Sequence, residues 1–419
     1  MKTAVAAPPV RHVRPFRDAS RTRPLWMRGL NRLARLAPGW PSLAAADLWR
    51  AAGAEPSGIG PTPAACEALE RLCDALAATG RLHGIGRIAA RDDTIRLART
   101  HLRIRRALAA TPAILDARLP PLVFVVGWPR TGSTALHALL AADPRHRSIP
   151  YWESFDPVPP ERGPDRRIEG LERMLAQLER FSPDYHAIHP MSAEGAEECV
   201  ALFMNHFRTL QFDFQYRVPD YVAWLLAQDA GIAYADYHDS LRLIQHHRPH
   251  GERFVLKDPT HLVHLETLLA RFPDARIVFT HRDPVTAISS LCSLYAHTRA
   301  IFSDDVDPRA IGAEVMTGYW PRALEAAQAI RARLEPGRFV DVRQVDLRRD
   351  PLAAVERIYT RLFGEGPDAA GRAAMERHLA AKDAAPRDRH EHDLADFGID
   401  ADAVRERFRA YREAFDFTD

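Results

Sequence analysis

The spacing of apolar residues changes twice along this chain. From about Trp26 to Ala110 they recur three and four positions apart, as in residues 65–80 and 94–110, which predicts amphipathic helices. At residues 122–126 five apolar residues follow one another between prolines and a glycine, the pattern of a strand buried on both faces of a parallel sheet. Helical spacing returns at once in residues 133–144.

Two further buried strands are predicted at residues 253–257 and 275–281, with a helix between them in residues 260–272. Such a βαβ unit with short connections favours a parallel sheet. Another strand is expected in residues 338–347, and helices close the chain near residues 396–415. We therefore expect an α/β fold: a P-loop-like, doubly wound parallel sheet flanked by helices.

The same pattern divides the chain into regions. Residues 1–20 are rich in basic residues and proline and predict a flexible arm, and residues 21–118 predict an N-terminal helical region with breaks at 37–42 and 54–63. Residues 119–419 predict the α/β domain. A mostly helical insertion, rich in aromatic residues, is expected within it at about 160–250.

Composition narrows the classes of protein that remain. The 419 residues are 46% hydrophobic, and 57 basic against 55 acidic side chains leave a net charge of +2. This balance creates no global field for nucleic acid, so any anion site is local. No apolar run reaches about eighteen residues, so no membrane span is expected.

Four cysteines, at positions 66, 73, 199 and 292, form no CxxC pair, and the absence of a signal-peptide pattern favours the cytoplasm, without disulfides. The histidines of residues 245–253 are interpreted as a solvated helix end, and no metal site is expected.

The first predicted strand runs into a loop that suggests phosphate binding. In residues 123–134, VFVVGWPRTGST, the glycines at 127 and 132 have P-loop spacing, but Ser133 stands where that motif has Lys. Backbone N–H groups, the hydroxyls of Ser133 and Thr134 and the guanidinium of Arg130 suit a phosphate. The alternative is an ordinary turn between a strand and a helix.

A second anion site is predicted after the strand at 275–281. Arg282 directly follows that strand, and Ser290 lies in the second turn of a helix starting at Pro284, so both reach the same point. The alternative is an Arg paired with a surface Asp. Two anion sites at neighbouring strand ends suggest one ligand with two separated phosphates.

These segments resemble the sulfotransferases that use 3′-phosphoadenosine 5′-phosphosulfate (PAPS). FVVGWPRTGSTALHALLAADP is similar to their 5′-phosphosulfate loop, and ARIVFTHRDPVTAISS to their 3′-phosphate segment. Lys-Asp-Pro at 257–259 resembles the tyrosylprotein and large bacterial branches. The helical N-terminal region, YWE at 151–153, VDLRRDP at 345–351 and RHEHDLADFGID at 389–400 are most similar to the bacterial branch.

The resemblance implies roles for individual residues. Arg130 and Lys257 would act as cations at the reacting group, without a metal, and Arg282 and Ser290 would bind the 3′-phosphate of PAPS or of its product, adenosine 3′,5′-bisphosphate. Glu153 is the expected base, which would need a raised pKa, and His261 is the rival base. The expected 5′-phosphate ligands are Arg130, Thr131, Gly132, Ser133 and Thr134.

Several alternatives stay open at this point. The aromatic residues at 207–226 either wall an apolar pocket or lid, which favours a hydrophobic or lipid-like alcohol as acceptor, or form the core of a helical layer. The competing functions are an ATP- and Mg²⁺-dependent P-loop phosphotransferase and a non-catalytic nucleotide-binding protein. Homo-oligomerisation is undecided. The residues Arg387, Arg389, His390 and His392 either close over the 3′-phosphate or form a solvated loop.

Overall fold

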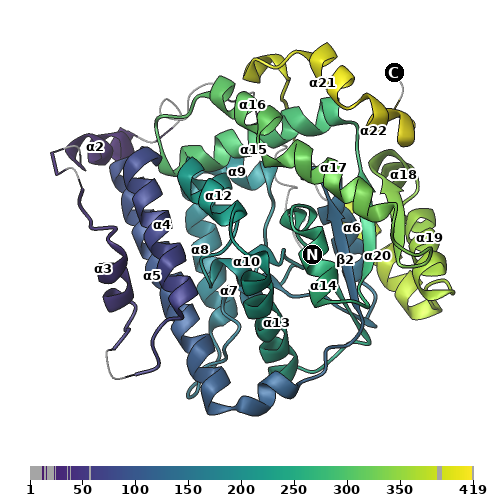
Figure 1. The fold of residues 1–419 in the computed structure, drawn as a ribbon, viewed down its shortest axis with the longest axis horizontal. Coiled ribbons are helices and arrows are strands. Elements are labelled where there is room, and N and C mark those ends of the chain that lie inside the picture. Colours follow the sequence, from purple (N-terminus) through teal and green to yellow (C-terminus); the bar gives the residue numbers. More distant parts are fainter. Residues whose placement is uncertain are drawn as a thin grey trace, which may run out of the picture.

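A computed structural model describes residues 12–13, 16, 23, 25–34, 36–37, 39–55, 58–384 and 389–417. Its centre is a parallel sheet of five strands in the order β3-β4-β2-β5-β6 (Figure 1). The strands are β2 (Leu122–Gly127), β3 (His146–Arg147), β4 (Arg253–Lys257), β5 (Arg276–His281) and β6 (Phe339–Arg343). The predicted α/β parallel fold is confirmed. The last strand is shorter than expected, because helix α18 (Gln344–Arg349) begins directly after Arg343.

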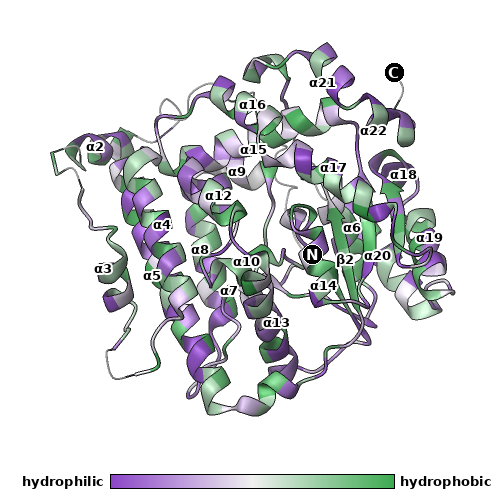
Figure 2. Cartoon of the chain, viewed as in Figure 1, coloured by the Kyte–Doolittle hydropathy of each residue, from purple (hydrophilic) through white to green (hydrophobic). Residues whose placement is uncertain are grey.

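Alternate residues of the strands enter two different cores, as expected for a sheet covered on both faces. Val123 and Val125 of β2 pack toward α6 (Ser133–Ala141), α19 (Pro351–Phe363) and α20 (Ala369–Ala384). Phe124 and Val126 pack toward α14 (Leu265–Arg271), α15 (Pro284–Phe302) and α17 (Tyr319–Arg331). Figure 2 shows β2 in the green of hydrophobic residues. Burial on both faces explains its uninterrupted apolar run.

The predicted helical regions lie on one side of the sheet in Figure 1. The N-terminal region contains α2 (Leu25–Ala34), α3 (Ala45–Ala51), α4 (Pro63–Thr79) and α5 (Gly84–Ala110), followed by a short 3₁₀ helix (Pro112–Asp116). The segment after β3 begins with α7 (Tyr151–Phe155). The insertion then contributes α8 (Arg167–Phe181), α9 (Pro183–Ile188), α10 (Val200–Met204), α11 (Gln211–Gln215), α12 (Pro219–Leu226) and α13 (Ala230–His247).

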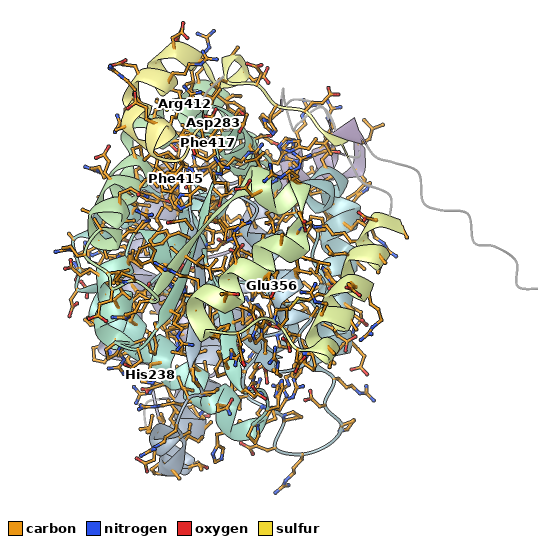
Figure 3. All side chains as sticks on the ribbon, turned by 90° about the vertical axis from the view of Figure 1, so that its right-hand side faces the viewer. His238, Asp283, Glu356, Arg412, Phe415 and Phe417 are labelled. Atoms are coloured by element: carbon orange, nitrogen blue, oxygen red, sulfur yellow. The ribbon has the colours of Figure 1, made fainter. Side chains whose placement is uncertain are left out.

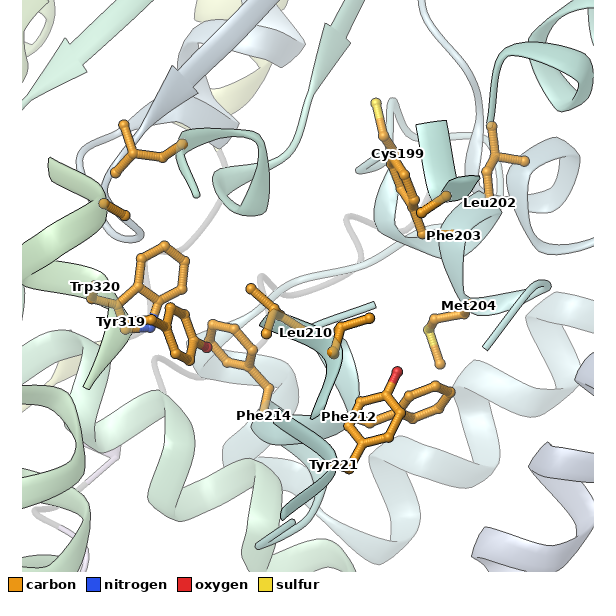
Figure 4. Packing of buried hydrophobic residues seen from close by; sticks show 14 of the residues in the cluster. Cys199, Leu202, Phe203, Met204, Leu210, Phe212, Phe214, Tyr221, Tyr319 and Trp320 are labelled. Carbon is orange, nitrogen blue, oxygen red and sulfur yellow. The ribbon is translucent and has the colours of Figure 1, made fainter. Parts of the chain in front are cut away.

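The aromatic residues of the insertion are core residues. Phe207, Phe212 and Tyr221 are at most 1% exposed, and the Phe212 ring packs against both of the others. Figure 4 shows Phe212 beside Tyr221, and Phe214 next to Tyr319 and Trp320 of α17. One continuous apolar cluster joins them to α4, α5 and the sheet. Of the two alternatives for this stretch, the core of a helical layer is the one that these rings support.

A segment near the N-terminus and a segment of the C-terminal part pair beside α15. Strand β1 (His12–Val13) pairs in parallel with β7 (Arg389–His390), and the Phe16 ring contacts that of His297 on α15. Residues 12–13 of the predicted flexible arm are thus paired with β7 through the backbone, and the flexibility of residues 1–20 stays a prediction. The rest of residues 1–20, apart from Phe16, lies outside the described residues, and so does the predicted site residue Arg387 within 385–388.

The C-terminal part packs over the start of α15. It packs against α16 (Pro308–Thr317) and consists of a 3₁₀ helix (Ala395–Phe397), α21 (Ala401–Arg407) and α22 (Arg409–Ala414). Arg412 pairs with Asp283 at 3.2 Å, and Phe415 stacks on His281 with 3.7 Å between ring centres. Figure 3 labels Asp283, Arg412 and Phe415 in this region. The end of β5 is thereby covered.

Two further observations concern sequence expectations. In the described part of the chain, no helix combines the length and the apolarity that crossing a bilayer requires. All four cysteines have free thiols, and Cys66 and Cys73 both lie on α4.

Candidate functional site

The loop between β2 and α6 is a tight turn whose shape depends on two glycines. A Cβ at Gly127 would lie 2.3 Å from Thr280 Oγ1, and Gly132 has a φ of +88° just before the first turn of α6. Thr131 donates to the carbonyl of Trp128 at 2.8 Å, so its hydroxyl supports the turn from inside. The N-terminus of α6, with Ser133 and Thr134, consequently stands at the carboxyl end of the sheet, where orphan N–H groups favour an anion.

The structure brings the two predicted anion-binding segments together. Arg130 Nε donates to Ser290 Oγ at 3.0 Å, and Arg282 Nη1 donates to the carbonyl of Arg130 at 2.9 Å. Strands β2 and β5 are neighbours, with Gly127 opposite Thr280, so the loop after β2 and the start of α15 meet. Arg130, Arg282 and Ser290 therefore form one cluster at the strand ends.

This cluster carries an excess of positive charge. Burial, the charge of Arg130 and the charge of Arg348 together lower the pKa of Arg282 to about 10. Arg348 is exposed on α18; it belongs to the quoted segment VDLRRDP but was not singled out there as a site residue. Close guanidinium groups repel one another, and a bound dianion relieves that repulsion. The electrostatics thus favour an anionic ligand beside Ser290.

Lys257 stands at the end of β4, opposite Val125 of β2. Its ammonium group donates to Thr134 Oγ1 at 3.1 Å and forms an ion pair with Glu198. The Lys257 side chain is 1% exposed and that of Glu198 is 17% exposed, so the carboxylate is on the accessible side of the pair. Lys257, Thr134 and Glu198 form a second polar group next to the first loop.

Glu198 is the functional candidate that sequence reasoning missed. The N–H of Cys199 donates to the carbonyl of Lys257 at 2.9 Å, which places Glu198 beside the end of β4. Adjacent carboxylates at 197 and 198, directly before an apolar run, were the signal available in the sequence. Burial opposes the ionisation of Glu198, but the charge and hydrogen bond of Lys257 outweigh it and lower its pKa. Burial and the neighbouring Glu198 raise the pKa of Glu197 to about 7.

Glu153 lies in a different environment from the one we expected. Both of its carboxylate oxygens accept from Arg147 Nη2, at 3.0 and 3.1 Å, and the Arg147 side chain is fully buried. Arg248 Nη1 also lies 3.6 Å from Glu153 Oε1. The Glu153 side chain is only 3% exposed and both of its oxygens are bound to Arg147, so this carboxylate links β3 to α7 and is poorly accessible to a substrate hydroxyl. This geometry speaks against Glu153 as the base.

His261 is also less suited to act as a base. Its ring is fully buried, Nδ1 lies 2.8 Å from the Tyr234 hydroxyl, and the Phe124 ring is packed edge-on at 5.1 Å. Burial, followed by the charge of His264, lowers the pKa of His261 to about 3. At neutral pH this ring is a neutral, weak base. The structure places it in the core behind Lys257.

The C-terminal histidines lie directly beside the cationic cluster. His392 Nδ1 is 2.9 Å from Ser289 Oγ, and His390 Nε2 is 2.8 Å from Ser293 Oγ, on the two sides of Ser290 along α15. These contacts favour the alternative in which this segment closes over the anion site. Across the residues that the structure describes, no group of three or more His, Cys, Asp or Glu side chains is arranged to hold a metal ion.

A model of the sulfotransferase family matches residues 121–365, which is more than half of the chain. The chain belongs to this sulfotransferase family. Its fold is similar to that of the sulfotransferase STF9 from Mycobacterium avium, with 27% identity, a TM-score of 0.76 and coverage of 89% of this chain and 97% of that one. It is also similar to the sulfotransferase STF1 from Mycobacterium tuberculosis H37Rv, with 31% identity, a TM-score of 0.68 and coverage of 91% and 98%.

A further relative is the omega-hydroxy-beta-dihydromenaquinone-9 sulfotransferase Stf3 of Mycobacterium bovis, which is 27% identical over 255 residues. The matched segment spans 58% of this chain and 62% of that relative. Family membership confirms the resemblance drawn from the sequence. The part of the chain that matches the family contains Arg130, Glu198, Lys257, Arg282 and Ser290, whereas His390 and His392 lie beyond it.

Proposed function

We propose that the chain transfers a sulfuryl group from PAPS to a hydroxyl group of an acceptor. The observation that supports this most is the meeting of Arg130, Arg282 and Ser290 at the end of β5, next to the loop between β2 and α6. A ligand with a phosphate at each of two separated points fits this pair of sites. The reaction of PAPS supplies the sulfuryl group and releases adenosine 3′,5′-bisphosphate.

The residues divide the work by position. Arg282, Ser290 and Arg348 hold the 3′-phosphate, and the N–H groups at the start of α6 hold the 5′-phosphate with Thr134. Arg130 and Lys257 stabilise the negative charge that develops on the leaving phosphate oxygen. Preorganised cations in a buried site contribute strongly to such stabilisation. No side chain has to become covalently attached.

We assign the base to Glu198 in place of Glu153 and His261. The acceptor oxygen forms its bond to sulfur as the bond from sulfur to the phosphate oxygen breaks, and the acceptor proton passes to the Glu198 carboxylate. The partial exposure of Glu198 leaves room for an acceptor hydroxyl, and its contact with Lys257 keeps it ionised near neutral pH.

The acceptor that we propose is a hydrophobic, lipid-like alcohol. The name of the Mycobacterium bovis relative describes a hydroxylated menaquinone derivative, which is a molecule of this class. A cytoplasmic location and any homo-oligomer stay predictions from the sequence.

Thermal-shift titration tests the nucleotide. We expect adenosine 3′,5′-bisphosphate to raise the unfolding temperature of the chain, and ATP with Mg²⁺ to have a smaller effect. Stabilisation by ATP–Mg²⁺ alone would favour a phosphotransferase instead. If the bisphosphate binds but no acceptor in a screen with labelled PAPS is sulfated, a non-catalytic nucleotide-binding protein is favoured.

Substitution of the carboxylate tests the base. We expect Glu198→Gln to lower kcat by about two to four orders of magnitude while the bisphosphate still stabilises the protein. Glu194→Gln is the matched control, since Glu194 is an exposed carboxylate in the same segment. Unchanged kcat in Glu198→Gln would remove Glu198 from this role.

A further inference from the structure

Helix α2 exposes an unusual number of large apolar side chains. Leu25, Trp26, Leu30 and Leu33 are between 49% and 81% exposed, and the turn that follows exposes Leu36 and Trp40 at 82% and 64%. We call these six residues the α2 patch. Single exposed apolar residues are ordinary on a soluble protein, but a contiguous group marks an interaction surface.

The patch is a fixed face of the protein. The opposite side of α2 packs on α5: Met27 and Asn31 are buried, and Asn31 accepts a hydrogen bond from the N–H of Ile85 at 3.0 Å. Just before the helix, Arg23 donates to the carbonyl of Ser303 at 3.1 Å and pairs with Asp304. Trp26, Leu30 and Leu33 follow helical spacing along one outward stripe. Figure 1 shows α2 at the upper left edge of the molecule, far from the sheet.

The charge around the patch indicates what it binds. Residues 19–46 contain no Asp or Glu. Within α2 itself Arg28 and Arg32 are exposed, on a different side from the apolar stripe. A helix with an outward Trp and Leu stripe and exposed arginines has the character of helices that lie in the interface of an anionic bilayer, where Trp occupies the headgroup level. Docking of a second protein chain would not by itself require a region with basic residues and no acidic ones.

The position of the patch relates it to the candidate site. The Trp26 ring lies 6.0 Å from the ring of Phe181, the last residue of α8, and the chain then enters α9 directly. The carbonyl of Ile188, at the end of α9, accepts from both terminal nitrogens of Arg130 at 3.5 Å. Tyr185 of α9 lies close enough to Glu197 and Glu198 for their charges to raise its pKa further, after the effect of burial. The short segment 181–188 therefore connects the α2 patch to Arg130 of the candidate site.

We propose that the α2 patch docks the protein on an anionic lipid surface without crossing it. Docking would also bring the candidate site close to an acceptor that resides in the bilayer. This role rests on the proposed function, whereas the binding to lipid does not. Trp26, Leu30 and Leu33 enter the interface, and Arg28 and Arg32 contact the negatively charged headgroups.

Vesicle co-sedimentation of the full chain tests this. We expect binding to vesicles of equal parts phosphatidylcholine and phosphatidylglycerol, weaker binding to phosphatidylcholine alone, and loss of at least about tenfold in affinity in the variant Trp26→Ser, Leu30→Ser, Leu33→Ser. Arg28→Gln with Arg32→Gln should reduce binding to the anionic vesicles by about tenfold at low salt. The matched control carries serine at three partly exposed apolar positions outside the patch: Ile59, Leu115 and Ile232.

The outcomes separate docking from activity. Folding of each variant is checked by its thermal stabilisation with adenosine 3′,5′-bisphosphate. If the parent fails to bind vesicles, or the patch variant binds as well as the control variant, the proposal is overturned. It is also overturned if ultracentrifugation shows that the parent is a dimer and the patch variant a monomer, while neither protein binds lipid. Vesicle binding in a protein that transfers no sulfuryl group would overturn the proposed function and leave the docking surface in place.

Discussion

The buried ion pair between Arg147 and Glu153 provides the sharpest test of how the site is assigned. Arg147 also donates to Gln245 Oε1 at 2.9 Å and to the carbonyl of Arg248 at 2.8 Å, so its guanidinium is surrounded by protein. Glu153→Gln removes the only full negative charge that it contacts directly among the described residues. The change therefore leaves a positive charge buried and only partly compensated.

The expected cost follows from this geometry. Removing one partner of a buried pair typically destabilises a protein by 3–5 kcal/mol, and the Gln amide still accepts one hydrogen bond, so we expect a loss of about 3 kcal/mol. Denaturant unfolding followed by circular dichroism measures it. Below the unfolding transition, kcat should stay within about twofold of the parent, because the Glu198 carboxylate is untouched.

Removing both charges gives the control. In Arg147→Met with Glu153→Leu no buried charge is left unpaired, and we expect much of the lost stability to return, since replacing a buried pair by apolar residues is often neutral. A stable Glu153→Gln protein whose kcat is a hundredfold lower would refute this reasoning. It would restore Glu153 as the base.

Two other predictions concern binding and pH. Arg282→Gln should weaken the binding of adenosine 3′,5′-bisphosphate by about tenfold to a hundredfold in calorimetry, because charge-assisted hydrogen bonds to the phosphate are lost. Arg357→Gln is the control, since Arg357 is exposed, and this variant should bind with the affinity of the parent. Equal affinities of the two variants would exclude Arg282 from the site. Burial, followed by the charges of His206 and Arg105, lowers the pKa of His101 to about 2, so this ring stays neutral in the folded chain while it takes up a proton below pH 6.5 in the unfolded chain. Its contribution to stability is complete above pH 6.5 and falls by about 2 kcal/mol by pH 5, and a His101→Asn protein with the same pH slope as the parent would contradict this.

The strands and the meeting of the two proposed anion-binding segments could be predicted because their signals are local. The short apolar run at Leu122–Val126, bounded by prolines and a glycine, indicates a strand covered on both faces, and β2 is such a strand. Arg282 and Ser290 are held at one point by the geometry of a single helix, which begins at Pro284 as the sequence indicated. Each of these predictions needed only the backbone of one segment.

The sequence by itself determined the class of fold, the order of its elements and the two segments that meet at the proposed anion site. Only the tertiary structure decided which carboxylate faces Lys257. Glu198 lies beside Lys257 because the next residue, Cys199, is hydrogen-bonded to β4, and Glu153 forms an ion pair with Arg147 of β3. The spacing of residues along the chain predicts neither partner. The same holds for α2, whose periodicity is identical whether its outer face is buried or bare. Burial and pairing depend on residues far apart in the chain, and folding alone brings those residues together.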